Sequence, residues 1–308
     1  MSPLAAALAD YLAVRRAMGY KLERAGKLLA QFVTYLDDAD ITTVTVEDAL
    51  AWAVLPAEGS VNWWAHRLSV VRGFATYLST IDPATEVPPA DLLSERNKRA
   101  TPFLYSDDDI AALLGATEMF SSPLRRATYR TLLGLLVVTG MRIGEAIRLD
   151  RTDLDARTGL LLVRSSKFGK DRQLPLHAST TQALTGYLAC RDRLFPEPET
   201  AAVFISTAGS RLRYCNVHKT FLKLIDHACL KPRSSSCRPR IHDLRHSFAV
   251  HTVLEGYRTD VDVQARLPLL STYLGHVHPA STYWYLSAAP ELLALAGQRL
   301  ENAMEDGR

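Results

Sequence analysis

The sequence predicts a mainly α-helical protein with one small antiparallel β-sheet, and three observations support this. Apolar residues recur at helical spacing along most of the chain. Residues 158–176, TGLLLVRSSKFGKDRQLPL, instead show two β-type runs around a short turn. Residues 83–103 are rich in proline and lack periodicity. With 308 residues, 47% hydrophobic and 22% charged, the chain is expected to form two globular domains joined by a linker.

The first part, residues 1–82, is expected to form four helices, at 4–20, 22–38, 49–54 and 60–81. Thr45 and Asp48 have the spacing of a capping box before the third helix. Four aromatic residues recur with apolar neighbours at helical intervals and are expected to belong to the core: Trp52, Trp63, Trp64 and Tyr77. We therefore predict a helical domain over 1–82 and a linker over 83–103.

The second part, residues 104–308, begins with Ser106 and Asp109, which are spaced to cap a helix. Further helices are expected at 124–140, 141–149, 178–194, 214–230, 242–256 and 280–303, with the β-hairpin between the second and third of these. A short strand is expected at AVFIS, residues 202–206. The prediction for this part is thus a helical domain that carries the small sheet.

Several classes of protein are excluded by what the sequence lacks. The four cysteines show no CxxC pair and no zinc-finger spacing, which argues against a disulfide scaffold or structural zinc. A run of eighteen apolar residues is absent, and the N-terminus lacks a basic region before its apolar stretch, so we expect a cytosolic protein without membrane span or signal peptide. Because a GxxxxGK[ST] loop and carboxylates paired for two-metal catalysis are absent, neither cofactor nor metal is expected.

Positive charge is concentrated in the second part. Residues 1–82 hold seven Lys/Arg against nine Asp/Glu, whereas residues 102–308 hold 26 against 21. Between Arg211 and Arg245, nine basic residues accompany only Asp226 and Asp243. Such a run is either a solvated surface or a strip that binds nucleic-acid phosphates. The candidates for DNA binding in it are Arg211, Arg213, Lys219, Lys223, Arg238 and Arg240.

The most unusual stretch is HDLRHSFAVH, residues 242–251. A metal site at His242 and His246 would have the i, i+4 spacing, but no Glu stands between them and no third ligand follows nearby. His242 and Arg245 share a helix face, and an arginine beside a histidine suits a phosphate oxygen. Leu244 and Phe248 are expected to anchor the helix, while His246, His251 and, further on, His278 are expected to pack or to support the site.

Three other segments carry similar residues. Arg142 follows a Thr-Gly break at a helix start, with Glu145 three residues later as its partner. Lys167 stands at the hairpin tip, with Lys170 as a rival in the same turn. His276 follows a Leu-Gly turn and precedes a helix capped by Ser281. This helix carries Tyr285, for which Tyr273 and Tyr283 are rivals as a reactive tyrosine.

Five features of the sequence resemble, in order, the motif series of the tyrosine recombinases, the phage-integrase and Xer-like family. They are TGMRIGEAIRL, SKFGKDRQLPL, HDLRH, LGH and a tyrosine nine residues after the LGH histidine. The resemblance covers most of residues 105–290. It implies that the N-terminal helices form a SAM-like core-binding domain and that residues 104–308 form the catalytic domain. It also implies a catalytic pocket made of Arg142, Lys167, His242, Arg245 and His276, supported by Glu145, with Tyr285 as nucleophile.

The chemistry of DNA cleavage explains these residue types. Attack on a phosphodiester places negative charge on its non-bridging oxygens, which two guanidinium groups bind in bidentate fashion. A tyrosine with a pKa of about 10 needs help to ionise, for which His242 is the candidate. Lys167 would protonate the departing oxygen, and His276 would donate a hydrogen bond to the phosphate. The product would be a 3′-phosphotyrosyl link and a free 5′-hydroxyl.

The resemblance further implies a homotetramer on two double-stranded DNA sites with inverted repeats, strand exchange through a Holliday junction, and a location on the bacterial nucleoid in the cytoplasm. The leucines of the C-terminal segment, at 292, 293, 295 and 300, would belong to the core or dock on a neighbouring protomer. The segment between HDLRH and LGH is longer than in Xer-like proteins by roughly two helical turns, which favours a mobile-element recombinase. The alternatives are a type IB topoisomerase-like or telomere-resolving enzyme and a catalytically silent DNA-binding regulator.

Overall fold

The computed structural model describes residues 2–93, 100–164, 171–259 and 262–275. The chain divides into two compact units, Met1–Arg99 and Ala100–Arg308, which are treated separately below. None of the helices in the described ranges is long and apolar enough to cross a membrane.

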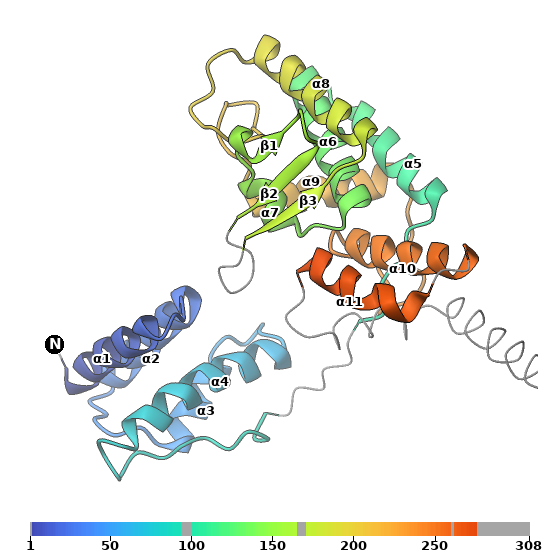
Figure 1. Cartoon of the computed structure of the whole chain (residues 1–308). Helices are drawn as coiled ribbons and strands as arrows, with labels where there is room; N and C mark the ends of the chain where they lie inside the picture. The colour runs from blue at the N-terminus through green and yellow to red at the C-terminus, as the bar shows by residue number, and fades with distance from the viewer. Residues whose placement is uncertain (1, 94–99, 165–170, 260–261, 276–308) are drawn as a thin grey trace, which may run out of the picture. The chain divides into compact units, whose positions relative to one another are not determined.

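The first unit contains four helices in its described residues, in agreement with the sequence: α1 (Pro3–Ala17), α2 (Glu23–Asp38), α3 (Val46–Val54) and α4 (Val61–Leu78) (Figure 1). The side chains of Ser2, Thr45 and Ser60 accept hydrogen bonds from backbone N–H groups in the first turns of α1, α3 and α4. The core is formed by the apolar faces of all four helices and includes Phe32 and Phe74, which are fully buried. Amphipathic spacing therefore accounts for this unit.

The four aromatic residues expected in this core behave differently from one another. Trp52 is buried, and the guanidinium of Arg67 stacks on its ring at 3.6 Å. Trp64 and Tyr77 are half-buried, whereas Trp63 is exposed. The prediction is wrong for Trp63 because consecutive residues lie about 100° apart around a helix, so the adjacent Trp63 and Trp64 cannot both face inward at the start of α4.

The segment between the units is held at both of its described ends. Arg72 of α4 donates to the carbonyl oxygens of Pro88 and Pro89, at 2.7 and 2.8 Å. On the far side, the backbone N–H of Phe103 donates to Asp243 at 3.2 Å. Among the described residues, contacts with the first unit extend to Leu93, which packs against its core, and contacts with the second begin at Thr101, whose carbonyl oxygen accepts a hydrogen bond from Arg240.

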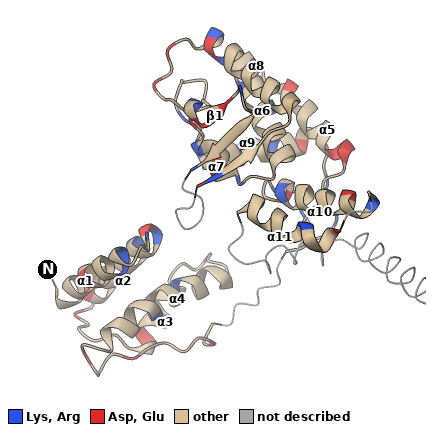
Figure 2. Cartoon of the chain, viewed as in Figure 1, with Lys and Arg blue, Asp and Glu red and all other residues tan. Residues whose placement is uncertain are grey.

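The second unit is mainly helical and carries a three-stranded antiparallel sheet of order β1-β2-β3. Its described elements are α5 (Asp107–Gly115), η1 (Ala116–Met119), α6 (Pro123–Thr139), α7 (Ile143–Arg148), η2 (Arg151–Asp153), β1 (Leu154–Asp155), β2 (Leu160–Val163), β3 (Arg172–Pro175), α8 (Ala178–Leu194), α9 (Tyr214–His227), α10 (Asp243–Arg258) and α11 (Val263–Leu274). α5 begins with the predicted capping box of Ser106 and Asp109, and its first turn is acidic (Figure 2). The mainly helical class with a small sheet is confirmed.

The predicted hairpin is formed by β2 and β3, with Leu161 opposite Leu174 and Val163 opposite Arg172. The AVFIS segment is not a strand, because it makes only single bridges, from Ala202 to Asp150 and from Ile205 to Arg211. The long segment between HDLRH and LGH was predicted only as an insertion. It contains the end of α10 and most of α11, which lie side by side (Figure 1).

Helix α6 packs against both α8 and α10 and forms the centre of this unit. It ends at Gly140, which adopts the left-handed conformation with φ +58°. A Cβ atom at this position would lie 2.4 Å from the ring of Phe248. A glycine is therefore required here both for the backbone turn and for the close approach of α10.

Candidate active site

Arg142 and Glu145 form the first part of the candidate site, at the start of α7. The backbone N–H of Arg142 donates to Oε2 of Glu145 at 2.9 Å, and Nη1 of Arg142 donates to Oε1 at 2.8 Å. Glu145 is buried, with 1% of its side chain exposed, whereas 27% of the Arg142 side chain is exposed. The expected partnership is thus present, and it orients the guanidinium of Arg142 without removing it from solvent.

Arg172 of β3 binds the other side of the same carboxylate, a contact that sequence analysis missed. Its Nη1 and Nη2 donate to Oε1 and Oε2 of Glu145 at 3.2 and 2.8 Å. Burial alone raises the pKa of Glu145, but the hydrogen bonds from Arg172 and Arg142 outweigh it and lower the pKa to about 2. Glu145 is therefore a permanent anion at neutral pH.

The pattern of β3 contained a signal for Arg172. Residues two apart in a strand share a face, and Leu174 is fully buried, so Arg172 also points inward. A buried arginine requires an acidic partner, and Glu145, an acid within an apolar helix, was available in the sequence.

His242 and Arg245 lie at the start of α10, one turn apart. Arg245 is buried, and its Nη1 donates to the carbonyl oxygen of Gly140 at 2.9 Å. Asp243 is also buried and accepts hydrogen bonds from the guanidinium of Arg240 at 3.0 and 3.1 Å. Asp243 therefore fixes the start of the helix, while Arg245 reaches toward the end of α6.

Three arginines from different elements meet the C-terminal end of α11. Arg172 Nε donates to the carbonyl oxygen of Tyr273 at 3.0 Å. Arg245 Nη2 donates to that of Leu274 at 2.6 Å, and Arg142 Nη2 to that of Gly275 at 3.3 Å. The last carbonyls of a helix lack intrahelical partners and carry partial negative charge, so they attract cations. The structure thus brings Arg142 and Arg245 together directly before His276 in the chain.

The positive charge around His242 affects its ionisation. Its pKa is lowered to about 4, first by loss of solvation and then by the charges of Arg245, Arg142 and Arg240. Part of His242 remains open to solvent, while its ring meets that of His246 edge-on at a centroid distance of 5.0 Å. His242 is consequently neutral at pH 7 and is able to accept a proton.

The remaining histidines of this helix differ in their environment. His246 is buried and its Nε2 lies 3.8 Å from Oδ1 of Asp243, in keeping with the expected packing role. His251 is exposed, so the packing prediction is wrong for it, since it lies on the solvent side of α10. In the described ranges, no group of three His, Cys, Asp or Glu side chains is arranged to hold a metal ion.

Six of the residues under consideration lie outside the described residues: Lys167, Lys170, His276, His278, Tyr283 and Tyr285. Of the rival tyrosines only Tyr273 is described. Its ring stacks on Phe248 at a centroid distance of 5.8 Å, and burial raises its pKa, an effect that the nearby Arg172 opposes. These contacts give Tyr273 a packing role.

The basic run between residues 211 and 245 divides into two groups. Arg213, Lys219, Lys223 and Arg238 are exposed. By contrast, Arg211 donates to the carbonyl oxygens of Ile147 and Leu149 and forms an ion pair with Asp150. Arg240 is engaged with Asp243. Arg211 and Arg240 thus have structural partners in addition to any part they take in DNA binding.

A cavity of about 540 Å³ collects several of these residues beside α9. Its lining includes five basic side chains, Arg125, Arg211, Arg213, Lys219 and Lys223, together with the hydroxyls of Ser206, Thr207, Ser210 and Thr220. None of the described residues that line it is acidic. Arg125 was not predicted; it donates to Thr220 at 3.1 Å. Such a cavity suits phosphate oxygens.

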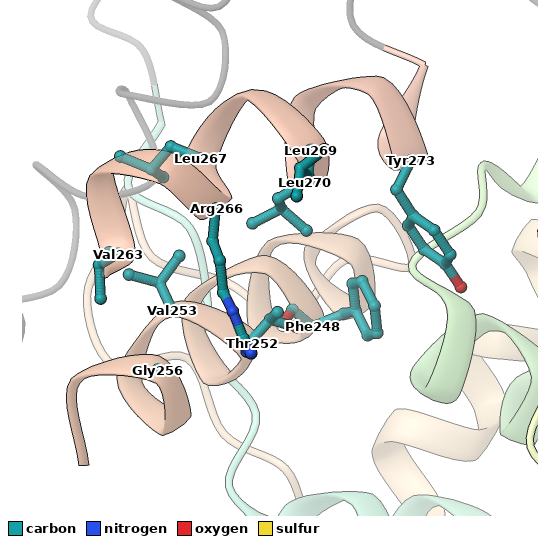
Figure 3. Close-up of a pocket in the computed structure, with 10 residues that line it drawn as sticks. All are labelled: Phe248, Thr252, Val253, Gly256, Val263, Arg266, Leu267, Leu269, Leu270 and Tyr273. Carbon is teal, nitrogen blue, oxygen red and sulfur yellow. The ribbon is translucent and has the colours of Figure 1, made fainter. Parts of the chain in front are cut away.

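An apolar groove of about 580 Å³ lies between α10 and α11. Figure 3 shows Val253 and Phe248 on one side and Leu267, Leu270 and Tyr273 on the other. Leu269, at its edge, is 69% exposed. A leucine this exposed beside an apolar groove is typical of a surface that receives another segment.

Comparison with known proteins identifies the family. A model of the phage integrase family matches residues 104–291. The chain is 42% identical over 312 residues to the "Putative integrase/recombinase y4rB" of Sinorhizobium fredii (strain NBRC 101917 / NGR234), with 99% of both chains covered. It is 30% identical to the tyrosine recombinase XerC of Alcanivorax borkumensis, over 82% of this chain and 78% of the relative.

Solved structures share the fold. The Tn1549 transposon integrase in complex with transposon right end DNA has a TM-score of 0.65 at 16% identity, covering 96% of this chain and 99% of the other. A lambda integrase tetramer bound to a Holliday junction has a TM-score of 0.60 at 18% identity, covering 92% of this chain and 76% of the other. The fold and the sequence together define an enzyme that cleaves and rejoins DNA strands. The chain belongs to the phage integrase family, and it is a tyrosine recombinase that acts in site-specific recombination.

Proposed function

We propose that this recombinase cleaves one DNA strand at a time with Tyr285 and holds the attacked phosphate between Arg142 and Arg245. The observation that carries the proposal is the meeting of these two arginines at the end of α11, one and two residues before His276. Two guanidinium groups from α7 and α10 provide fixed donors for the charge that gathers on the phosphate. His276 is the next residue in the chain after Gly275.

His242 is proposed to assist the nucleophile. His242 is neutral at pH 7 in the protein without DNA. The negative charge of the bound phosphate opposes the arginine charges that lower its pKa, so that in the complex His242 accepts the proton of the Tyr285 hydroxyl. The tyrosine oxygen then forms a bond to phosphorus while the bond to the 5′-oxygen of the next nucleotide breaks. Lys167 gives a proton to that departing oxygen, and His276 donates a hydrogen bond to the phosphate. The energy of the broken bond is retained in the 3′-phosphotyrosyl link, so a second 5′-hydroxyl can reseal the strand.

We propose that both units bind double-stranded DNA. The basic cavity beside α9 supports this for the second unit, because its exposed side chains, Arg213, Lys219 and Lys223, suit successive phosphates. The first unit, with its four helices, is proposed to be a SAM-like core-binding domain over residues 1–82, joined through a linker over 83–103 to a catalytic domain over 104–308. The DNA sites are proposed to carry inverted repeats.

The active assembly is proposed to be a homotetramer on two DNA sites, which exchanges strands through a Holliday junction. The groove between α10 and α11 supports this, because the chain continues from Gly275 into a further 33 residues that contain the leucines at 292, 293, 295 and 300. We propose that this segment of one protomer docks in the groove of its neighbour. The enzyme is expected to serve a mobile element on the nucleoid of a bacterial cytoplasm.

The test is covalent capture. A duplex that the wild-type protein binds is first selected from a randomised library, and a nick is placed in its spacer so that the cleaved fragment diffuses away. The wild-type protein should form a protein-DNA adduct that survives denaturing electrophoresis, and Tyr285→Phe should abolish it while Tyr283→Phe retains it. An adduct with Tyr285→Phe would overturn the assignment. Relaxation of supercoiled DNA that lacks the selected duplex would instead indicate a topoisomerase-like enzyme.

A further inference from the structure

Arg172, outside the set of proposed catalytic residues, connects three parts of the site. It lies at the start of β3, and 13% of its side chain is exposed. Nη1 and Nη2 bind both oxygens of Glu145, and Nε binds the carbonyl oxygen of Tyr273. A single planar guanidinium thus links the hairpin, α7 and the end of α11.

The first consequence is electrostatic. Glu145 is buried and ionised, and with Arg142 alone it would form a neutral pair. Arg172 adds a second positive charge to the same carboxylate, so the group of three carries a net positive charge. Glu145 is thereby shared between two arginines, and Arg142 retains attraction for an anion. Such an arrangement orients the guanidinium of Arg142 without neutralising its positive charge.

The second consequence is geometric. The hairpin turn that contains Lys167 ends directly before Asp171, and His276 directly follows Gly275. Arg172 packs so closely on Gly275, which has φ +69°, that a Cβ atom there would lie 3.0 Å from Nη1. The start of β3 and the end of α11, which are the described parts of the chain next to Lys167 and His276, are therefore fixed to one another through Arg172.

We infer that Arg172 is a positioning residue for strand cleavage, which acts through Glu145 on Arg142 and through Tyr273 and Gly275 on the His276 segment. The inference rests on the proposed function of Arg142 and His276. Only 13% of the Arg172 side chain is exposed, and its guanidinium is engaged by Glu145 and Tyr273, so its removal should affect the rate of cleavage far more than DNA affinity. A misplacement of about 1 Å is sufficient to slow a reaction about 10²-fold.

The experiment compares Arg172→Ala and Arg172→Lys with the wild-type protein on the selected, nicked duplex. Affinity is measured by fluorescence anisotropy and cleavage as the single-turnover rate of adduct formation. For Arg172→Ala we expect a rate about 10²-fold lower with Kd changed less than about threefold. The cleavage rate of Arg172→Lys should lie between those of the wild-type protein and Arg172→Ala. One ammonium group cannot reproduce both the bidentate contact with Glu145 and the third hydrogen bond, to Tyr273.

Arg164→Ala is the matched control. Arg164 also belongs to the hairpin and pairs with carboxylates, those of Asp150 and Asp153, but it does not contact Glu145. Arg164→Ala should be less stable than the wild-type protein, but its cleavage rate should not fall by more than its DNA affinity and folding account for. The double variant Glu145→Gln with Arg172→Ala should lose less rate than the product of the two single losses, because both changes act on Arg142 and only Arg172→Ala also acts on the end of α11.

The possible outcomes separate the two proposals. A wild-type rate for Arg172→Ala would overturn the positioning role, as would a loss of rate that is matched by an equal loss of affinity or folding. The absence of an adduct with the wild-type protein itself would instead overturn the proposed function.

Discussion

Arg245 Nη2 donates to the carbonyl oxygen of Leu274 at 2.6 Å, so the buried arginine of α10 is fixed against the last turn of α11. Its Nη1 donates to the carbonyl of Gly140, at the end of α6. The guanidinium plane is consequently defined by the ends of two helices. Under the proposed function, a phosphate that enters the site would meet donors whose direction is already set, which is the condition for electrostatic catalysis.

The first prediction concerns Arg245→Lys. A lysine ammonium group cannot span both carbonyls and also bind two phosphate oxygens, because its three donors radiate from one atom. We expect the single-turnover rate of adduct formation to fall about 10²–10³-fold, while the affinity for the selected duplex changes little. Arg193→Lys, at an exposed arginine of α8 that is not a candidate for DNA binding, serves as control and should cleave normally. A rate for Arg245→Lys within about threefold of the wild-type rate would contradict the proposal that Arg245 holds the phosphate.

The second prediction concerns the pKa of His242 in the protein without DNA. A titration of its Cε1 proton by NMR, assigned with His242→Gln, should give a midpoint of about 4 instead of the ordinary 6.5. Arg245→Gln removes a nearby positive charge and should raise this midpoint. The unfolded chain binds a proton at this residue below pH 6.5, whereas the folded chain does so only near pH 4. His242 therefore makes folding less favourable as pH falls through this window. A midpoint near 6.5 would show that neither loss of solvation nor the neighbouring arginines lower the pKa of His242.

The third prediction separates two basic residues that the sequence placed in one strip. Arg211→Ala removes donors from the carbonyls of Ile147 and Leu149 and the partner of Asp150, so the free energy of unfolding should fall by about 1–3 kcal/mol. Lys223→Ala should leave stability within about 0.5 kcal/mol. It should reduce the slope of log affinity against log salt concentration by about 1. The measurements are urea unfolding and anisotropy at several salt concentrations. The reverse pattern would place Arg211, and not Lys223, at the DNA backbone.

Most of the fold was predictable because it follows from local patterns. Helical periodicity and the capping residues Thr45 and Ser106 predicted the helices of both units, and α8 was predicted at its observed bounds. α11 was not predicted, because Pro268 inside it reads as a break. Pro268 is the sixth residue of α11 and removes the backbone donor that would reach the carbonyl oxygen of Gln264. The helix forms nevertheless, because Leu267, Leu270 and Leu274 pack against α10 and the side chain of Asp262 caps its N-terminus.

The candidate site was predictable in its residue types but not in its connections. Spacing linked Arg142 to Glu145, since three residues form one helical turn. The contact between Arg172 and Glu145 joins residues 27 apart, and that between Arg245 and Leu274 joins residues 29 apart. Such contacts depend on how α7, β3, α10 and α11 pack, which periodicity does not specify. Packing also decides which basic residues between 211 and 245 are exposed and which, like Arg211 and Arg240, bind other parts of the protein.

The last prediction concerns the groove between α10 and α11. Leu269 is 69% exposed at its edge, so Leu269→Lys should fold normally, because the lysine remains in water. If the C-terminal segment of a neighbouring protomer docks in this groove, a charge at its edge opposes the burial of that segment's leucines. We expect the variant to bind a single selected duplex with unchanged affinity but to lose the complex of two duplexes and four protomers. Mass photometry on the wild-type and variant complexes measures this directly. Leu194→Lys, at a leucine that is 45% exposed at the end of α8, is the matched control and should assemble. Assembly of Leu269→Lys at the wild-type concentration would show that the groove does not hold the protomers together.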